Sequence, residues 1–482
     1  MALRSAGFGR RAFLTGAAAA TVVAFDPVGL GWITEADAAD GIEVPGLDGE
    51  LVVDPEALAE AAEDYGQIVH RRPIAVLRPG SVRDILAMVR FANRHGIKVA
   101  MRGQGHSVFG QAQVLAGVVI DSRTLATIHA VSAAGAVVDA GVRWVDLIRA
   151  ALARGLTPPV STDYIGLSVG GTLSVGGIGG ASSHHGLQVD NVRELEVVTG
   201  DGRLVRCSER DDAELFRAVL GGLGQFAIIV RATIRLAPAE TTARVYRLSY
   251  PTVAALTAAQ RIALADGRFD YLEGQVVPIE GGGWGFLLEG AVFFTPPAVP
   301  RDDEVLAGMN PAATEIAELP YFGWLDRITA IVDQLRQLRL PNPWINLFLP
   351  GPATDALVAG ALDGLTPADT GGGPILLYPV PRARLTRPFV VVPDSAVVFL
   401  FAILRMVSPP DDAVVQRLLR ANRALYDRAR AAGGTLYPVS ALPMSPADWR
   451  AHLGAAYPRF ARAKSRFDPR NVLTPGQGIF CI

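Results

Sequence analysis

A glycine-rich turn at residues 102–107, Arg-Gly-Gln-Gly-His-Ser, constrains this chain more than any other segment. It follows an apolar run at 97–101 that is typical of a β-strand. Its two glycines let the backbone approach a ligand closely and leave successive N–H groups pointing outward, which suits a phosphate. The nucleophilic imidazole of His106 comes directly after them. The turn therefore predicts a nucleotide cofactor held by its pyrophosphate and open to a covalent bond; a tight turn without a ligand is the alternative.

The composition is typical of a globular enzyme. The 482 residues are half hydrophobic and 19% charged, with a net charge of −2, and this length allows two or three domains. No long basic stretch is interleaved with aromatic residues, which argues against nucleic acid or an anionic membrane surface as a partner. The two cysteines, Cys207 and Cys481, give neither a disulfide framework nor metal-ligand spacing. We therefore expect no metal site, and free thiols or a single bridge both remain open.

The first 39 residues have the order of a twin-arginine export signal. Arg10 and Arg11 precede Phe-Leu, an apolar stretch covers 16–25, and the small-x-small sequence at 36–38 offers a cleavage site. The apolar stretch is too short to cross a bilayer, which takes roughly 20 residues. We expect export to a periplasmic or extracellular location, often a route for proteins that already carry a cofactor. A disordered basic tail is the alternative.

The rest of the chain divides into three predicted segments. Strand and helix patterns alternate over 40–240; apolar strands, arginine-rich helices and proline-rich joints follow over 241–442; and 443–482 ends in a turn-rich stretch. A capping box predicts a helix that begins after Ser81 and ends at Gly96. The other expected elements are strands at 74–77, 97–101, 137–142, 195–199, 228–236, 245–250, 285–288 and 397–404, and helices at 144–154, 325–338 and 411–431.

A second glycine-rich segment, at 168–180, follows the polar pair Asp163-Tyr164. Valine, leucine and isoleucine alternate with its glycines. A solvated linker would not need these apolar residues, so the pattern favours a backbone packed against a flat ligand. A flexible linker remains the alternative.

Together these features resemble the FAD-linked oxidases of the vanillyl-alcohol oxidase superfamily, and within it the cytokinin dehydrogenase family. The resemblance covers nearly the whole chain after the signal. The matching motifs, in order, are Arg-Gly-Gln-Gly-His-Ser at 102–107, Gly-Gln-Ala at 110–112, Asp163-Tyr164, Val-Gly-Gly-Thr-Leu-Ser at 169–174, His185-Gly186, Asn191-Val192, Leu-Gly-Gly-Leu-Gly-Gln-Phe at 220–226, Tyr-Leu-Glu-Gly at 271–274, Pro-Trp-Ile-Asn at 343–346 and Thr-Pro-Gly-Gln at 474–477.

The resemblance implies an α+β fold with two parts. Residues 40–240 would form a two-subdomain FAD-binding domain of the PCMH type. Residues 241–442 would form a substrate domain, with an antiparallel sheet flanked by helices, that covers the flavin. Residues 443–482 would return to the FAD domain.

The resemblance also assigns the cofactor residues. His106 matches the histidine that this family bonds to the flavin 8α-methyl group. Relatives with a second, cysteinyl bond have a cysteine near the glycine-rich segment, and this chain has none there, so a single covalent link is expected. The full set of expected FAD-binding residues is Met101, Gly103, Gln104, Gly105, His106, Ser107, Gln111, Asp163, Ser168, Ser174, Ile178, Ile229, Tyr437, Thr474 and Gln477.

Two acidic residues are candidates for catalysis. Oxidation of a secondary amine by hydride transfer to flavin N5 builds positive charge on the substrate nitrogen, and Asp163 would accept the N–H proton. Glu273 matches a family glutamate that holds the purine side of the substrate. The alternatives are a turn or cap aspartate for Asp163 and an exposed strand residue for Glu273.

The expected activity is that of an exported FAD-dependent oxidoreductase acting on an N6-substituted adenine or a similar secondary amine, with oxygen or a quinone-like molecule as acceptor. An alcohol or sugar oxidase of the same superfamily, or a flavin-binding redox protein without turnover, is the alternative. Gly166 and Val175 replace larger or polar residues of the plant enzymes, and a family insertion is shortened, so residues 275–324 are expected to be a trimmed lid. These departures bear on the substrate, and the flavin chemistry should survive them.

Overall fold

The computed structural model describes residues 22–26, 31–34 and 42–480. Most of the predicted export signal and Cys481 lie outside the described residues. The part of the signal region that is described contains two paired strands, β1 (Val22–Asp26) and β2 (Gly31–Thr34), and β1 also pairs with β3 (Ile42–Glu43). Within the described ranges, no helix has the length and apolar character needed to cross a bilayer.

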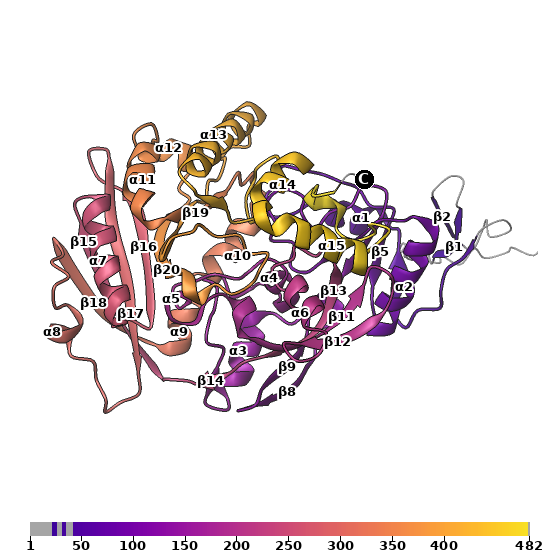
Figure 1. Ribbon diagram of the computed structural model, residues 1–482, viewed down its shortest axis with the longest axis horizontal. Helices are drawn as coiled ribbons and strands as arrows, with labels where there is room; N and C mark the ends of the chain where they lie inside the picture. Colours follow the sequence, from indigo (N-terminus) through magenta and orange to yellow (C-terminus); the bar gives the residue numbers. More distant parts are fainter. Residues whose placement is uncertain (1–21, 27–30, 35–41, 481–482) are drawn as a thin grey trace, which may run out of the picture.

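The first unit is a four-stranded sheet in the order β4-β5-β7-β6, in which β5 and β6 both run parallel to β7 (Figure 1). Helix α2 joins β5 to β6. It begins with the predicted capping box of Ser81 and Asp84 and ends at Gly96, whose φ of 70° a glycine adopts easily. The bounds are β4 (Glu50–Val52), α1 (Pro55–Ala61), β5 (Ala75–Arg78), α2 (Val82–His95), β6 (Val99–Arg102) and β7 (Val118–Asp121).

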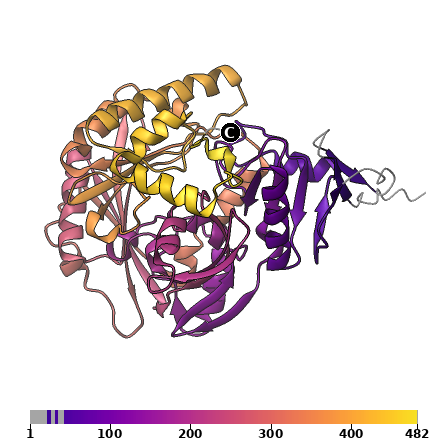
Figure 2. The ribbon, with the colours of Figure 1, turned by 45° about the vertical axis from the view of Figure 1, so that its right-hand side comes forward.

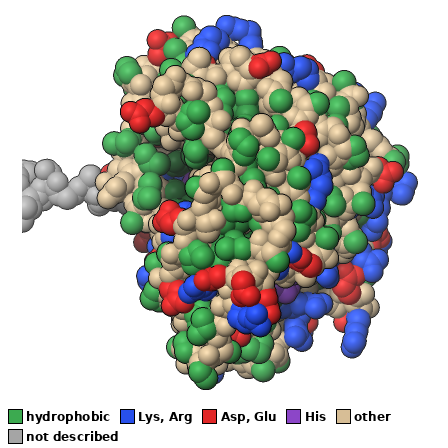
Figure 3. All heavy atoms as spheres, turned by 90° about the vertical axis from the view of Figure 1, so that its left-hand side faces the viewer, with side chains coloured by type: hydrophobic (Ala, Val, Ile, Leu, Met, Phe, Trp, Pro, Cys, Tyr) green, Lys and Arg blue, Asp and Glu red, His purple; other side chains and the backbone are tan. Residues whose placement is uncertain are grey.

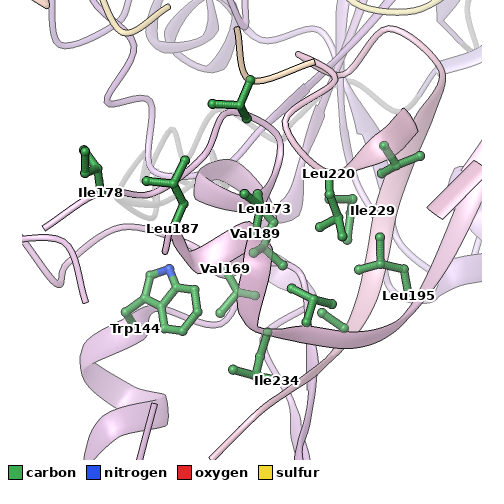
Figure 4. Packing of buried hydrophobic residues seen from close by; sticks show 14 of the residues in the cluster. Trp144, Val169, Leu173, Ile178, Leu187, Val189, Leu195, Leu220, Ile229 and Ile234 are labelled. Carbon is green, nitrogen blue, oxygen red and sulfur yellow. The ribbon is translucent and has the colours of Figure 1, made fainter. Parts of the chain in front are cut away.

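The second unit is a five-stranded antiparallel sheet in the order β12-β11-β13-β9-β8. Its helices bury Trp144, Val169 and Leu173 against the sheet (Figure 4), and the Trp144 indole donates a hydrogen bond to Thr172 Oγ1 over 2.8 Å. The bounds are β8 (Ile128–Ser132), β9 (Gly135–Asp139), α3 (Trp144–Leu152), α4 (Val169–Leu173), β11 (Val192–Thr199), β12 (Leu204–Ser208), α6 (Ala213–Val219) and β13 (Ala227–Ile234).

The third unit is an eight-stranded sheet whose neighbouring strands are all antiparallel, in the order β18-β15-β17-β16-β20-β21-β19-β22. Helices α7, α11 and α13 pack on it (Figures 1 and 2). The bounds are β15 (Thr242–Tyr250), α7 (Val253–Asp266), β16 (Tyr271–Pro278), β17 (Trp284–Phe294), β18 (Ala313–Pro320), β19 (Ile345–Pro350), α11 (Thr354–Leu362), β20 (Ile375–Pro381), β21 (Val397–Ile403), α13 (Asp412–Ala431) and β22 (Thr435–Leu436).

Two expectations about this third unit were wrong. Residues 275–324 are not mainly a lid: they complete β16 and supply β17 and β18, with the short helix α8 (Asp302–Val305) between these two strands. The single helix expected at 325–338 is two helices, α9 (Tyr321–Leu325) and α10 (Thr329–Gln337). The break between them turns Arg327 inward, where its guanidinium lies 4.0 Å from the ring centre of Trp324.

The C-terminal helices α14 (Pro446–Leu453) and α15 (Tyr457–Phe467), drawn in yellow in Figure 2, pack on the core of the second unit. The chain then pairs with β6 through a bridge between Val99 and Leu473, and Thr474 N donates to Val99 O over 2.8 Å. The mixed α+β architecture, with an antiparallel eight-stranded sheet in the third unit, confirms the expected fold class. The boundaries proposed at 240 and 442 stay predictions.

Charge is interspersed on the face that carries the edge of the large sheet. Figure 3 shows basic and acidic side chains side by side there, among hydrophobic ones. Ion pairs account for part of this pattern, because Arg244 pairs with Asp302 and Arg301 pairs with Glu304 at 2.8 Å. Such a face offers no continuous basic track for a nucleic acid backbone.

Candidate active site

The predicted phosphate turn is open at its backbone. β6 ends at Arg102, and Gly105 has a φ of 63°, which lets the chain reverse. In the described part of the chain, no protein acceptor lies within reach of the backbone N–H groups of residues 104–107. The turn is nevertheless held from behind, because Tyr65 N donates to Gly105 O at 2.8 Å and Gly66 N donates to Ser107 O at 3.1 Å. A rigid row of free donors is what a pyrophosphate needs.

Aromatic rings enclose the imidazole of His106. Tyr65 stacks on it at 4.4 Å between ring centres, Tyr164 lies at 5.0 Å, and Trp344 meets it edge-on at 5.6 Å. Arg336 Nη1 lies 3.3 Å from its Nδ1. Burial, and then the charge of Arg336, lower the pKa of His106 to about 3, so the imidazole is neutral at physiological pH.

The second glycine-rich segment begins against this turn. A Cβ on Gly103 would lie 2.1 Å from Ser168 Oγ, so a larger residue there would have to displace the serine side chain. Farther along, the Tyr437 hydroxyl accepts a hydrogen bond from Gly177 N at 3.0 Å, and burial raises the pKa of Tyr437 to about 12. Ser174 Oγ donates to Gly170 O at 2.8 Å.

The C-terminal turn completes the same region. Gly476 packs so closely on the 110–113 backbone that a Cβ there would lie 2.3 Å from Gly110 O. Thr474 Oγ1 donates to Gly224 O at 2.9 Å, and Gln477 O accepts from the indole of Trp449 at 2.9 Å. Gln111 uses its amide to reach Ser440 O at 3.1 Å. The structure thus brings together segments near residues 105, 170, 440 and 475.

Three expected apolar cofactor residues have different surroundings. Met101 packs on the core of the first unit, and Ile178 and Ile229 belong to the core of the second. Figure 4 shows Ile229, which belongs to β13, beside Leu220, whereas Ile178 lies at the far side of the same cluster.

Asp163 lies in a charged cluster with Tyr271 and Arg327. The Tyr271 hydroxyl donates to Asp163 Oδ1, and Arg327 Nη2 donates to the same oxygen at 3.1 Å and to the Tyr271 hydroxyl at 2.6 Å. Asp163 Oδ2 accepts no hydrogen bond from any described residue, and a fifth of the side chain, 20%, is exposed. One oxygen is therefore fixed and the other is free to meet a ligand.

Two further carboxylates, Glu273 and Glu289, surround the same guanidinium. Arg327 Nη2 lies 3.7 Å from Glu289 and 4.0 Å from Glu273. Glu273 is only 1% exposed, and within the described residues its Oε1 has no hydrogen-bond partner. Burial, with the nearby charge of Asp163, raises the pKa of Glu273 well above its usual value, so we treat it as a neutral carboxylic acid.

Sequence reasoning found Asp163 and Glu273 but missed Arg327, Arg336 and the aromatic cage of His106. The break in the predicted 325–338 helix, had it been visible, would have pointed to Arg327. Arginines are frequent throughout this part of the chain, so neither arginine carries a local signal.

The donor set fits a flavin nucleotide. The free N–H row at 104–107 suits a pyrophosphate, and the aromatic rings that enclose the imidazole beside it suit a flat ring system. No group of three or more His, Cys, Asp or Glu side chains with the geometry of a metal site occurs among the described residues. Cys207, by contrast, is buried on β12, away from these segments.

Comparison with protein families gives two matches. Residues 73–208 match the family described as "FAD binding domain", and residues 308–480 match "Cytokinin dehydrogenase 1, FAD and cytokinin binding".

Curated relatives cover almost the whole chain. An uncharacterized oxidoreductase of the fasciation locus of Rhodococcoides fascians is 40% identical over 87% of this chain and 96% of its own length. Cytokinin dehydrogenase 5 of rice, Oryza sativa subsp. japonica, is 38% identical over 90% of this chain and 91% of its own. Cytokinin dehydrogenase 4 of Arabidopsis thaliana is 34% identical over 89% and 92%.

Solved structures share the fold. The 6-hydroxy-D-nicotine oxidase of Arthrobacter nicotinovorans matches with a TM-score of 0.68 at 21% identity, covering 89% of this chain and 96% of that one. The xylooligosaccharide oxidase of Myceliophthora thermophila matches with a TM-score of 0.70 at 18% identity, covering 87% and 94%. At these identities the likeness concerns architecture, and it bears out the expected FAD-binding oxidase fold.

Proposed function

Since the chain belongs to the cytokinin dehydrogenase family of FAD-dependent oxidoreductases, we propose that it oxidises the secondary amine of an N6-substituted adenine or a closely similar compound. The relatives named as cytokinin dehydrogenases support this substrate class, because they match along nine-tenths of the chain. The product imine would hydrolyse in water to a free amine and an aldehyde.

The observation that carries the proposal is the asymmetry of the Asp163 carboxylate. Tyr271 and Arg327 both bind Oδ1, so the side chain cannot rotate freely, and Oδ2 keeps its lone pairs for a substrate N–H. Loss of a hydride from the carbon next to nitrogen builds positive charge on that nitrogen. A fixed carboxylate that accepts the N–H proton stabilises this charge without reorganising.

Glu273 gives the site its second recognition element. A buried carboxylic acid that keeps its proton can donate a hydrogen bond from the carboxyl to a ring nitrogen of a purine, and its unpartnered Oε1 can accept one. A purine substrate has ring nitrogens that this carboxyl donor can bind, whereas an alcohol or a sugar does not. The pair Asp163 and Glu273 therefore favours an adenine-like amine.

Bound FAD would supply the hydride acceptor, N5 of its ring system. The residues that would hold it are the free N–H row at 104–107, Ser168 with the segment that follows it, and the turn at 474–477. We propose one covalent link, from His106 to the flavin 8α-methyl group, which would prevent loss of the cofactor after export. Export itself is proposed on the twin-arginine pattern at 10–38. The acceptor that reoxidises the flavin would be oxygen or a quinone-like molecule.

Anaerobic bleaching of the flavin absorbance tests the substrate class. The purified protein is mixed with N6-alkyl adenines, simple secondary amines, alcohols and oligosaccharides in separate experiments. Rapid bleaching by the N6-alkyl adenines is expected. Bleaching by sugars alone would contradict the proposal, and bleaching by none of the compounds would favour a binding protein without turnover.

Two variants assign the chemistry to the site. Asp163→Asn should slow bleaching by about 10² to 10⁴-fold, the usual contribution of a positioned proton acceptor. Asp270→Asn is the matched control, because Asp270 precedes Tyr271 but its carboxylate only accepts a hydrogen bond from Phe293 N.

A second variant tests the covalent link. Flavin fluorescence should persist on an acid-treated denaturing gel of the wild-type protein and disappear in His106→Ala.

A further inference from the structure

Arg336, a residue of the third unit, contacts the glycine-rich turn of the first unit that contains His106. Arg336, near the end of α10, donates from Nη2 to Gln104 O at 2.6 Å and places Nη1 3.3 Å from His106 Nδ1. No residue of α10 is fully buried, and the helix is joined to the cofactor side by polar contacts such as that of Asp333 with the Tyr164 hydroxyl at 2.6 Å. Nothing in the proposed amine oxidation uses this contact.

The contact fixes where the imidazole carries its proton. A guanidinium is always charged and has only donors, so the ring nitrogen that faces it must be an acceptor. Nδ1 of His106 therefore carries the lone pair and Nε2 carries the proton. The stacked ring of Tyr65 and the edge of Trp344 keep the imidazole from turning over.

The guanidinium also has room to leave. A polar cavity of about 160 Å³ lies between the end of α10 and the cofactor turn, lined by Tyr65, Gly105, Arg336 and Arg339 among others. A swing of the Arg336 side chain into this space would uncover Nδ1 and leave both backbones in place.

We propose that Arg336 is a positioning residue for covalent flavin attachment, holding the Nδ1 lone pair of His106 ready for the flavin 8α carbon and then yielding its place. This inference rests on the proposed His106–FAD link. It assigns to α10 a role in making the holoenzyme, separate from substrate oxidation.

The reaction balances with dioxygen as the oxidant. The Nδ1–C8α bond forms, and one C–H bond of the 8α-methyl group and the Nε2–H bond of His106 break. The two electrons and two protons released reduce the flavin, and dioxygen then takes them up as hydrogen peroxide. The side chain of Arg336 changes no bond; it sets which nitrogen attacks.

The test follows covalent attachment directly. Full-length protein made in flavin-limited cells is mixed with FAD in air, and gel fluorescence after denaturation is recorded over time. We expect Arg336→Ala to bind FAD, as judged by its native absorbance, but to attach it about tenfold more slowly, the effect of losing one hydrogen bond to a charged group. Arg336→Lys, which keeps a cationic donor, should recover most of the rate.

Controls separate this inference from its premise. Arg339→Ala is the matched variant, because Arg339 also crosses between the domains, to Glu63, and makes no contact with His106. It should attach flavin at the wild-type rate. Wild-type attachment in Arg336→Ala would overturn the inference alone, whereas absence of covalent flavin in the wild-type protein would overturn the proposed link itself. If flavin-free protein does not stay folded, the covalent fraction of protein purified from ordinary cells gives the same comparison.

Discussion

At the scale of single residues, the main feature of the candidate site is that three carboxylates lie around one arginine. Asp163, Glu273 and Glu289 all lie within 4.0 Å of one guanidinium, that of Arg327, and Arg247 offers a second cation only to Glu289, at 3.1 Å. Arg247 is 39% exposed and also pairs with Glu315 at 3.2 Å, so Arg327 is the one cation of the described residues that is buried among the three carboxylates. Burying a carboxylate without a full counter-charge favours its protonated form. Glu273, the most deeply buried of the three at 1% exposed, is the one whose pKa burial raises well above its usual value, so it keeps its proton.

Tyr271→Phe should separate positioning from binding. The change removes the hydroxyl that binds Asp163 Oδ1 and accepts from Arg327, and it leaves the ring and the Arg327–Asp163 hydrogen bond, so Asp163 becomes less fixed without losing its charge. We expect kcat for the best amine to fall about tenfold, with KM nearly unchanged. Steady-state kinetics measure both constants. Tyr250→Phe is the control, since that hydroxyl binds Met309 O at 3.1 Å in the same sheet, and an equal loss there would contradict the assignment.

Glu273→Gln should change how stability depends on pH. The folded chain keeps the Glu273 proton above the usual pKa of 4.5, whereas the unfolded chain releases it, so in wild type this group lowers stability as pH rises. Glutamine cannot titrate. Urea unfolding should therefore show the variant gaining on wild type as pH rises from about 5, by at most about 1.4 kcal/mol per unit. A difference that stays flat from about pH 5 to 8 would show that Glu273 is ionised in the folded state.

At the scale of helices and strands, local signals were reliable and tertiary ones were not. The capping box at Ser81, the stop at Gly96 and the apolar strands follow from neighbouring residues, and the structure has them where the sequence predicts them. The break between α9 and α10 does not follow from neighbouring residues, because it depends on contacts of Trp324 and Arg327 with residues far along the chain. The glycine turn of His106 was visible for the same local reason, and its aromatic cage, built from distant segments, was not.

The start of α2 gives a prediction at this scale. Asp84 is 2% exposed, and its carboxylate accepts hydrogen bonds at 2.8 Å from the backbone N–H groups of Asp48, Gly49 and Gly80. Asp84→Asn leaves one acceptor oxygen for these donors, so the free energy of unfolding should fall by about 2 kcal/mol. Denaturant unfolding measures it. Asp146→Asn changes an acid at the exposed start of α3 and should cost less than about 1 kcal/mol.

At the scale of the whole molecule, the candidate cofactor site is held by segments more than 350 residues apart. The last turn follows α15, which packs on the second unit, and Lys464 of α15 bonds both to that unit and to Asp468. Its ammonium lies 2.7 Å from Asp468 Oδ2 and donates to Gln225 O at 3.0 Å, while Asp468 accepts from Val472 N at 2.9 Å. Closing the site therefore depends on tertiary contacts of the C-terminal segment, which lies far along the chain from the glycine turn of His106.

Lys464→Met should loosen this closure. The methionine fills a similar volume but leaves the buried carboxylate of Asp468 without its cation, so the free energy of unfolding should fall by about 3–5 kcal/mol. Because the 474–477 turn follows Asp468 directly, the variant should also lose FAD more readily. In a His106→Ala background, where any retained flavin is non-covalent, gel filtration would measure this loss as a lower ratio of flavin to protein absorbance.

A neighbour on the same helix provides the contrast. Arg466 pairs with Glu214 at the surface of α15, so Arg466→Ala should change stability by less than about 1 kcal/mol and leave flavin retention unchanged. If both variants retained flavin equally while only Lys464→Met lost stability, the C-terminal turn would not hold the cofactor. Equal loss of flavin in both would instead mean that any weakening of α15 opens the site, and that the buried pair has no special part in closing it.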